Sequence, residues 1–301
     1  MSPTPTRDTP EGRAYNDLRN LAKQQRRDAA EYLALYVLEG FLVRLSRSTH
    51  APNLVLKGGV LMAAFAARRP ARDIDLKATG MANDIVEVEA MVAAIAAIPA
   101  GDGLMFDLDS IHGEPIRDDA DYEGIRVHLT AHLSTAVIPF HVDVNFGDPI
   151  WPAPTTVALP RLLGGTVRLL GYPLHMALTE KIVTSIERGT ANTRWRDFVD
   201  IASIADTTSV PAENLATAMQ VVADFRRVTL KPLAEVLKGI GDIAQPKWTA
   251  WRRKQRLTDT TPAHFQQLVD ACITFADPVI TGSATHALWT PATHTWIAPT
   301  E

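Results

Sequence analysis

LVLKGGVLMAAFAARRPARDIDL, residues 54 to 76, is the stretch of sequence that decides the fold. Its apolar start predicts a buried strand over 54–57, and the alanine-rich run that follows predicts a short helix over 60–67. Its last residues open a second predicted strand, over 73–78. A strand, a helix and a second strand in immediate succession indicate a sheet covered by helices.

Two carboxylates share one face of the second strand. Because strand side chains alternate, Asp73 and Asp75 project together while their neighbours enter a core. Close carboxylates repel each other unless a cation neutralises them, and a hard divalent ion with oxygen ligands is the usual solution. At the start of the helix, Gly58 and Gly59 leave amide N–H groups free, and the helix dipole there favours an anion such as phosphate. The combination predicts a site for nucleotide chemistry.

A third carboxylate comes from the strand predicted over 138–146. Apolar residues alternate along it with His141, Asp143 and Asn145, so these three share the opposite face. An aspartate on a half-buried strand is costly without a partner. If this strand lies beside 73–78, Asp143 reaches the same site as the aspartate pair.

The rest of the chain predicts an α+β fold, a mixed sheet with covering helices followed by a helical C-terminal part. The further elements expected before residue 150 are helices over 28–47 and 83–98 and strands over 104–109 and 124–130. The segment 150–173 is rich in proline and glycine and predicts a linker. Helices are expected over 174–188, 193–206, 211–226, 230–239 and 262–275.

The composition describes an ordinary globular protein. The chain has 301 residues, 46% hydrophobic and 21% charged, with a formal net charge of -4. An avid, non-specific nucleic-acid binder would normally be basic, so any RNA contact must come from a local patch. The single cysteine, Cys272, excludes an internal disulfide and a cysteine metal cluster. With no secretory signal or membrane-length apolar run, we expect no membrane association and a cytoplasmic location.

Several motifs together carry a family resemblance. Gly-Gly, a short helix and Asp-x-Asp resemble the nucleotidyltransferase superfamily of the DNA polymerase β type. Five segments between residues 28 and 205 resemble, in order, the AbiEii toxin family, which includes the MenT toxins. These segments are Val55–Gly59, Arg72–Leu76, Val142–Asp148, Thr179–Lys181 and Ala191–Asp200.

The resemblance implies a role for each matching residue. Asp73, Asp75 and Asp143 would be catalytic and would bind Mg²⁺, or Mn²⁺ in its place. Lys181 would contact the triphosphate, and Asp200 would orient Lys181 or a nucleotide group, which makes both part of the catalytic set. The residues expected to bind the nucleoside triphosphate (NTP) are Lys57, Gly58, Gly59, Arg72, Lys181 and Arg194.

The expected domain organisation combines the composition and periodicity of the chain with this resemblance. Residues 1–27 form a flexible segment with a short helix, and 28–170 form the nucleotidyltransferase domain. Residues 171–276 form a helical domain, and the Thr-, Pro- and Ala-rich end, 277–301, is expected to be irregular.

Each of the less specific residues also has a plain structural alternative. Lys57 could be a solvated strand end, and Arg72 could simply pair with a carboxylate. The charges from Lys181 to Asp200 could belong to a solvated, salt-bridged helix surface. The aromatic and basic segment 248–256 could hold an RNA end, although a helix with a buried tryptophan stripe is the favoured interpretation.

The function implied by the resemblance is that of a toxin in a toxin–antitoxin system. Such an enzyme adds nucleotides, often pyrimidines, to the 3′ end of tRNA and blocks aminoacylation and translation. A cognate AbiEi-like antitoxin would be its partner. Two alternatives stay open: the same chemistry on a small-molecule or protein acceptor, and a non-catalytic nucleotide-binding module. The histidines His128, His132 and His141 lack convincing metal-ligand spacing.

Overall fold

The computed structural model describes residues 5–65, 71–116, 124–147 and 149–298. The chain forms two compact units. The first comprises Met1–Asp148 with Pro154–Tyr172, and the second comprises Pro149–Ala153 with Pro173–Glu301. Asp143 therefore belongs to the first unit, together with Asp73 and Asp75, and Lys181 and Asp200 belong to the second.

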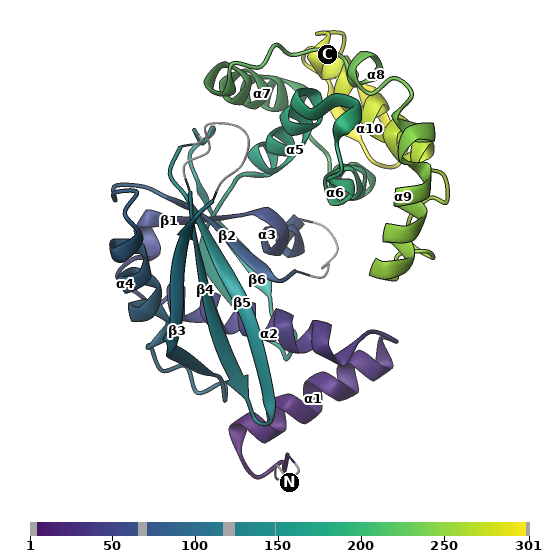
Figure 1. Cartoon of the computed structure of the whole chain (residues 1–301). Helices are drawn as coiled ribbons and strands as arrows, with labels where there is room; N and C mark the ends of the chain where they lie inside the picture. The colour runs from purple at the N-terminus through teal and green to yellow at the C-terminus, as the bar shows by residue number, and fades with distance from the viewer. Residues whose placement is uncertain (1–4, 66–70, 117–123, 148, 299–301) are drawn as a thin grey trace. The chain divides into compact units, whose positions relative to one another are not determined.

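The first unit is built on a seven-stranded mixed sheet with the strand order β3-β4-β5-β2-β1-β7-β6 (Figure 1). Its strands are β1 (Leu54–Lys57), β2 (Asp73–Ala78), β3 (Met105–Pro115), β4 (Gly124–Leu133), β5 (Ala136–Asn145), β6 (Thr155–Pro160) and β7 (Thr166–Gly171). The pairs β2–β5 and β1–β7 are parallel, and the other neighbours are antiparallel. The predicted α+β class with a mixed sheet is confirmed, and the predicted bounds of β1 and β2 match the structure.

Helices cover one face of this sheet. They are α1 (Pro10–Gln24), α2 (Ala29–Leu45), the 3-10 turn η1 (Ala51–Asn53), α3 (Gly58–Phe65) and α4 (Ile85–Ala96). The helix α2 packs against β5 and β7, and α4 packs against β3 and β4. Alternating strand residues fill the core beneath them, including Ile74, Leu76, Val142 and Val144, each fully buried. The polar residues of the same strands consequently face the other side.

The helix α1 is more closely packed than its polar, weakly periodic sequence suggests. It begins at Pro10, with the Thr9 hydroxyl accepting from the Gly12 amide, and it packs against α2 and β4. Its buried stripe is narrow, since Ala14, Leu18 and Ala22 recur every four residues among charged neighbours. Two of these three side chains are a single methyl group, which gives the local pattern little apolar signal.

The segment 150–173 is not the linker that its composition predicted. Val157, Leu159, Val167 and Leu169 are buried and alternate with exposed residues, so β6 and β7 form a hairpin at the edge of the sheet. The glycines supply the turn, because Gly164 and Gly165 both have positive φ and Gly164 donates to the Arg161 carbonyl. The segment resembles a linker in composition because its turn contains glycines and every second residue of its strands is exposed.

The second unit is largely helical. Its helices are α5 (Leu174–Arg188), the 3-10 turn η2 (Gly189–Ala191), α6 (Trp195–Thr207), α7 (Ala212–Arg226), α8 (Leu233–Val236), α9 (Ile240–Gln255) and α10 (Phe265–Ile280). The aromatic-basic segment lies at the end of α9, where Trp248 is fully buried and Arg252 donates to the Thr258 and Thr261 carbonyls. This arrangement matches the favoured interpretation of a buried tryptophan stripe.

The C-terminal segment was expected to be irregular, but part of it forms regular structure. The strands β8 (Leu288–Thr290) and β9 (Thr295–Ile297) form a hairpin. Trp289 is 2% exposed and donates to the Ala205 carbonyl at 2.7 Å, and Trp296 donates to the Phe275 carbonyl. Two tryptophans thus anchor a segment whose Thr, Pro and Ala content carries almost no strand signal.

None of the described helices combines the length and the apolar character needed to cross a bilayer.

Candidate active site

The polar face of β2 carries the predicted aspartate pair. Asp73 and Asp75 are half-buried and alternate with Ile74 and Leu76, which are fully buried on the helix-covered face. The local sequence dictates this arrangement, because the strand period of two separates apolar from acidic residues.

The neighbouring strand β5 brings the third aspartate to the same face. It runs parallel to β2, with His141 opposite Asp73 and Asp143 opposite Asp75. Residues directly opposite each other on paired strands project from the same face. The structure therefore brings Asp73, Asp75 and Asp143 together on one side of the sheet, and Asp143 is only 7% exposed.

Both oxygens of Asp143 are engaged by an arginine from the next strand. Arg126 on β4 lies opposite Asp143, and its Nε and Nη2 donate to Oδ1 and Oδ2 at 2.8 and 2.7 Å. Such a two-pronged contact between guanidinium and carboxylate is the strongest form of this ion pair. The hydrogen bond to Asp143 also raises the pKa of Arg126. Arg126 was not among the residues predicted from the sequence.

A row of charged residues crosses five strands at this level. Register places Lys57, Asp75, Asp143, Arg126 and Glu114 as successive neighbours along it. Lys57 is 6% exposed, with its Nζ 5.5 Å from the centre of the Tyr172 ring, so it is not a solvated strand end. Cations on both sides of the two aspartates reduce their mutual repulsion.

The glycine turn lies against the same carboxylates. Gly58 begins α3 with φ of +67°, and a Cβ at this position would collide with the carboxyl group of Asp75. Only glycine satisfies both the positive φ and the close approach. The N-terminus of α3, with the amides of Gly58 and Gly59, is thereby placed beside Asp75. Arg72, the residue immediately before β2, is exposed.

The second predicted constellation lies in the helical unit. Lys181 on α5 is 8% exposed, and its Nζ lies 2.9 Å from Asp197 Oδ1 and 2.9 Å from Asp200 Oδ2, both on α6. This is a buried cluster and not the solvated helix surface considered as the alternative. Asp197 was not predicted as a site residue, although its spacing of three from Asp200 places both on one helix face.

The segment before α6 holds the remaining predicted residue. Asn192 is 1% exposed, and its Oδ1 accepts from the Arg194 amide at 2.8 Å. The Arg194 side chain itself is exposed. The asparagine therefore fixes the backbone at the start of α6, and the arginine projects from that fixed point.

The ligand types on the sheet suit a hard divalent cation, because carboxylate oxygens are what such ions prefer. Among the described residues, however, no group of three or more His, Cys, Asp or Glu side chains is placed to hold a metal ion. Arg126 donates to both oxygens of Asp143, so a cation bound there would compete with the guanidinium for this carboxylate. Asp143 would join Asp73 and Asp75 around a cation only after the guanidinium moved away.

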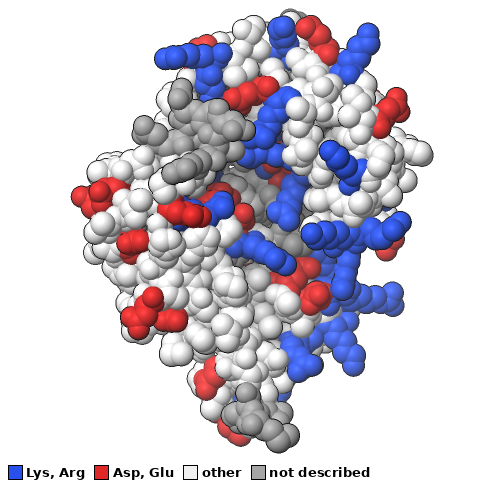
Figure 2. Space-filling view, viewed as in Figure 1, with Lys and Arg blue, Asp and Glu red and all other residues white. Residues whose placement is uncertain are grey.

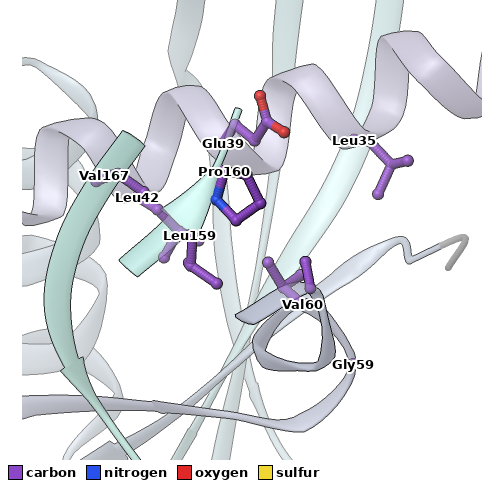
Figure 3. Close-up of a pocket in the computed structure, with 9 residues that line it drawn as sticks. Leu35, Glu39, Leu42, Gly59, Val60, Leu159, Pro160 and Val167 are labelled. Carbon is purple, nitrogen blue, oxygen red and sulfur yellow. The ribbon is translucent and has the colours of Figure 1, made fainter. Parts of the chain in front are cut away.

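A separate small pocket lies on the helix side of the first unit (Figure 3). It is lined by α2, α3 and the β6–β7 hairpin, with Leu35, Val60 and Leu159 among its apolar residues. Glu39 enters it from α2, and its two carboxylate oxygens accept from the Leu162 amide at 3.1 and 3.0 Å. The carboxylate therefore secures the turn between β6 and β7.

The arrangement of paired aspartates beside a helix-starting glycine turn on a mixed sheet is that of a nucleotidyltransferase. A family model described as "Nucleotidyl transferase AbiEii toxin, Type IV TA system" matches residues 40–271. The chain belongs to this AbiEii family of nucleotidyltransferase toxins of type IV toxin–antitoxin systems, which confirms the resemblance found in its motifs. Membership implies an antitoxin partner.

Solved structures similar to this chain include the following two. One is a "putative nucleotidyltransferase" from H. pylori, with 14% identity and a TM-score of 0.47 over 81% of this chain and 92% of that chain. The other is JHP933 from Helicobacter pylori, with 13% identity and a TM-score of 0.46 over 81% and 89%. No curated protein matches the chain.

Proposed function

We propose that this toxin transfers a nucleoside monophosphate, from a pyrimidine NTP, to the 3′ end of tRNA and so blocks aminoacylation and translation. The observation that carries the proposal is the register of β2 and β5, which puts Asp75 and Asp143 side by side next to the Gly58 turn. The acceptor class and the pyrimidine preference rest on the family resemblance.

In this proposal the terminal ribose hydroxyl attacks the α-phosphorus of the NTP. A new oxygen–phosphorus bond forms, the bond to the bridging oxygen of the β-phosphate breaks, and pyrophosphate leaves. Asp143 is the group best placed to take the proton of the attacking hydroxyl, once the Arg126 guanidinium has moved away from the Asp143 carboxylate. The amides of Gly58 and Gly59 bind triphosphate oxygens and orient the α-phosphorus for in-line attack.

Asp73, Asp75 and Asp143 are the residues that would hold Mg²⁺, or Mn²⁺ in its place. A bound divalent ion supplies charge neutralisation of the phosphates and a lower pKa for the attacking hydroxyl. Lys57 and Arg72 are further candidates for phosphate contacts. Lys181 is proposed to neutralise the triphosphate, with Asp200 and Asp197 orienting its ammonium group, and Arg194 to assist in nucleotide binding.

The proposal is tested by incubating the protein with total RNA, Mg²⁺ and each labelled NTP in turn. We expect label on tRNA-sized RNA with CTP or UTP, and loss of that label in Asp75→Asn. Asp109→Asn, an exposed aspartate on β3, serves as the matched control and should retain transfer. Label on the protein or on a small molecule would show that the acceptor is not tRNA. Absence of label with all four NTPs would overturn the proposal. A cytoplasmic location and an AbiEi-like antitoxin complete the proposed biology.

A further inference from the structure

A second row of side chains crosses the open face of the sheet beside the charged row. Register makes His112 on β3, His128 on β4 and His141 on β5 successive neighbours, and Asp73 on β2 follows them. The ring centres of His112 and His128 are 6.5 Å apart with an interplanar angle of 20°, and those of His128 and His141 are 5.7 Å apart with an interplanar angle of 47°. Three imidazoles therefore form a continuous strip that ends at the carboxylates.

Exposure along this histidine row increases with distance from the carboxylates. The side chain of His141 is 23% exposed and that of His128 is 45% exposed, and His112 at the outer end is also exposed. The strand residues that alternate with them, such as Val127 and Val142, are fully buried on the helix-covered face. The row therefore offers ring surface to a ligand and is not part of the core.

The inner end of the row adjoins the atoms proposed to react. His141 Nε2 lies 3.9 Å from Asp73 Oδ2 and 3.9 Å from Asp143 Oδ1. An acceptor whose terminal hydroxyl lies at these aspartates must leave the site across a neighbouring surface. The histidine row is a surface that begins at the right place and is lined by flat rings.

The chemistry of the row suits nucleobases. Unstacked bases bind by stacking on aromatic side chains, and histidine is one of those used. Stacking tolerates any base, because every base has a flat π-face. The net charge is -4, and Figure 2 shows both signs of charge on the face in view, with Lys and Arg more numerous on its right-hand side. Glu114, which would repel a phosphate, lies 3.0 Å from His128 Nε2 and opposite Arg126.

We propose that His112, His128 and His141 form a stacking surface for the unpaired bases at the 3′ end of the acceptor RNA. This inference rests on the proposed function and adds to it the place where the acceptor binds. His112 and His128 contact bases and do not take part in bond making, whereas His141 lies too close to Asp73 and Asp143 for its binding role to be tested separately.

The test measures binding of a fluorescently labelled single-stranded RNA by anisotropy, without NTP. We expect the His112→Ala/His128→Ala double variant to bind ~tenfold or more weakly, the scale expected for losing one or two stacked bases. The His112→Phe/His128→Phe variant should bind nearly as well as wild type, because phenylalanine keeps the stacking surface and loses the imidazole nitrogens. Rescue by phenylalanine separates stacking from a hydrogen-bonding or electrostatic role.

His132→Ala is the matched control. His132 lies on the same face of β4, four residues beyond His128 and opposite Val137, so it is outside the row. Equal weakening by His132→Ala and by the double alanine variant, or no weakening by the latter, would overturn the inference. Wild-type protein that binds no single-stranded RNA would also overturn it and would direct attention to a protein ligand for this face.

Failure of the inference is distinguishable from failure of the proposed function. Transfer to RNA with unchanged RNA affinity in the double alanine variant rejects the histidine row and leaves the function. Weakened RNA binding in that variant, together with no nucleotide transfer by wild type, rejects the function and leaves the row. In the transfer assay we expect the double alanine variant to raise KM for RNA while leaving KM for the NTP unchanged.

Discussion

The two charge clusters of this protein hold their carboxylates in different ways. On the sheet, Asp143 is paired with Arg126, whose side chain is 35% exposed. In the helical unit, Asp197 and Asp200 share one buried ammonium, that of Lys181, whose side chain is 10% exposed. The sheet cluster is thus paired by a partly exposed cation, and we call it the open cluster, whereas the helical cluster holds a largely buried cation between two carboxylates, and we call it the closed cluster.

The largest expected effect comes from removing the cation that the two carboxylates of the helical cluster share. Lys181→Met leaves two largely buried carboxylates without the ammonium that both contact. We expect it to lower the free energy of unfolding by about 3–5 kcal/mol, the usual cost of removing one partner from a buried ion pair. Urea denaturation followed by circular dichroism measures the change.

The control for this prediction is an exposed ion pair of the same unit. Lys231 lies 3.7 Å from Glu235, with side chains 52% and 64% exposed, so Lys231→Met should cost less than about 1 kcal/mol. Adding Asp197→Asn and Asp200→Asn to Lys181→Met should recover part of the lost stability. If Lys181→Met costs no more than Lys231→Met, the cluster is not closed as described.

On the sheet, the close approach of Gly58 to Asp75 gives the next largest expected effect. Gly58→Ala must place a side chain at φ of +67° and push the Asp75 carboxyl group aside. We expect a loss of stability greater than the ~1–2 kcal/mol that a left-handed residue alone costs, together with loss of nucleotide transfer. Thermal denaturation and the labelling assay measure the two effects.

Gly101→Ala isolates the backbone contribution. Gly101 has φ of +68°, almost the same as Gly58, but an added Cβ would meet nothing within 4 Å. It should therefore show the cost of the left-handed backbone alone and keep full transfer. Equal behaviour of the two variants would mean that contact with Asp75 has no consequence.

The residues around Gly58 also show how far the sequence can predict such a site. β1 was predictable from a continuous apolar run, and the shared face of Asp73 and Asp75 in β2 follows from an alternation of acidic and apolar residues. The positions of Lys57 and Gly58 at the site are predictable too, because both residues stand where the first strand ends. These features depend only on local period and turn chemistry, which a single sequence contains.

Features that depend on strand pairing were not predictable in the same way. Arg126 stands on a predicted strand, but only the register of β4 against β5 brings it to Asp143. The same holds for the row that joins His112, His128 and His141. The hairpin of β6 and β7 was missed for a different reason, since an edge strand buries only every second residue and its glycine turn resembles a linker.

Arg126 also provides a smaller test of the contrast between the open and the closed cluster. Arg126→Gln should cost only about 1 kcal/mol of stability, because the arginine is partly exposed. It should strengthen binding of Mn²⁺, measured by electron paramagnetic resonance of the free ion, because both oxygens of Asp143 become available. The matched control is Arg168→Gln, an exposed arginine on β7 of the same sheet. Unchanged Mn²⁺ affinity in Arg126→Gln would show that Arg126 does not compete for Asp143.

The smallest expected effect is a pH dependence of stability that arises from a buried histidine without a charged partner in the described part of the chain. Both ring nitrogens of His175, at the start of α5, are buried and have no hydrogen-bond partner among the described residues. Burial lowers the pKa of His175 below its ordinary value of 6.5. As the pH falls through 6.5 the unfolded chain takes up a proton before the folded chain does, so stability is full above this pH and declines below it.

We therefore expect wild type to lose stability between about pH 7.5 and about pH 5.5, and His175→Phe to lose less, because phenylalanine does not titrate. A single site contributes less than about 1.4 kcal/mol per pH unit, so the difference between the two proteins should stay below that slope. His141 has a lowered pKa for the same reason and is present in both proteins, so the comparison cancels it. An equal change in urea midpoint between the two pH values for both proteins would mean that His175 accepts its proton in the folded state at no cost.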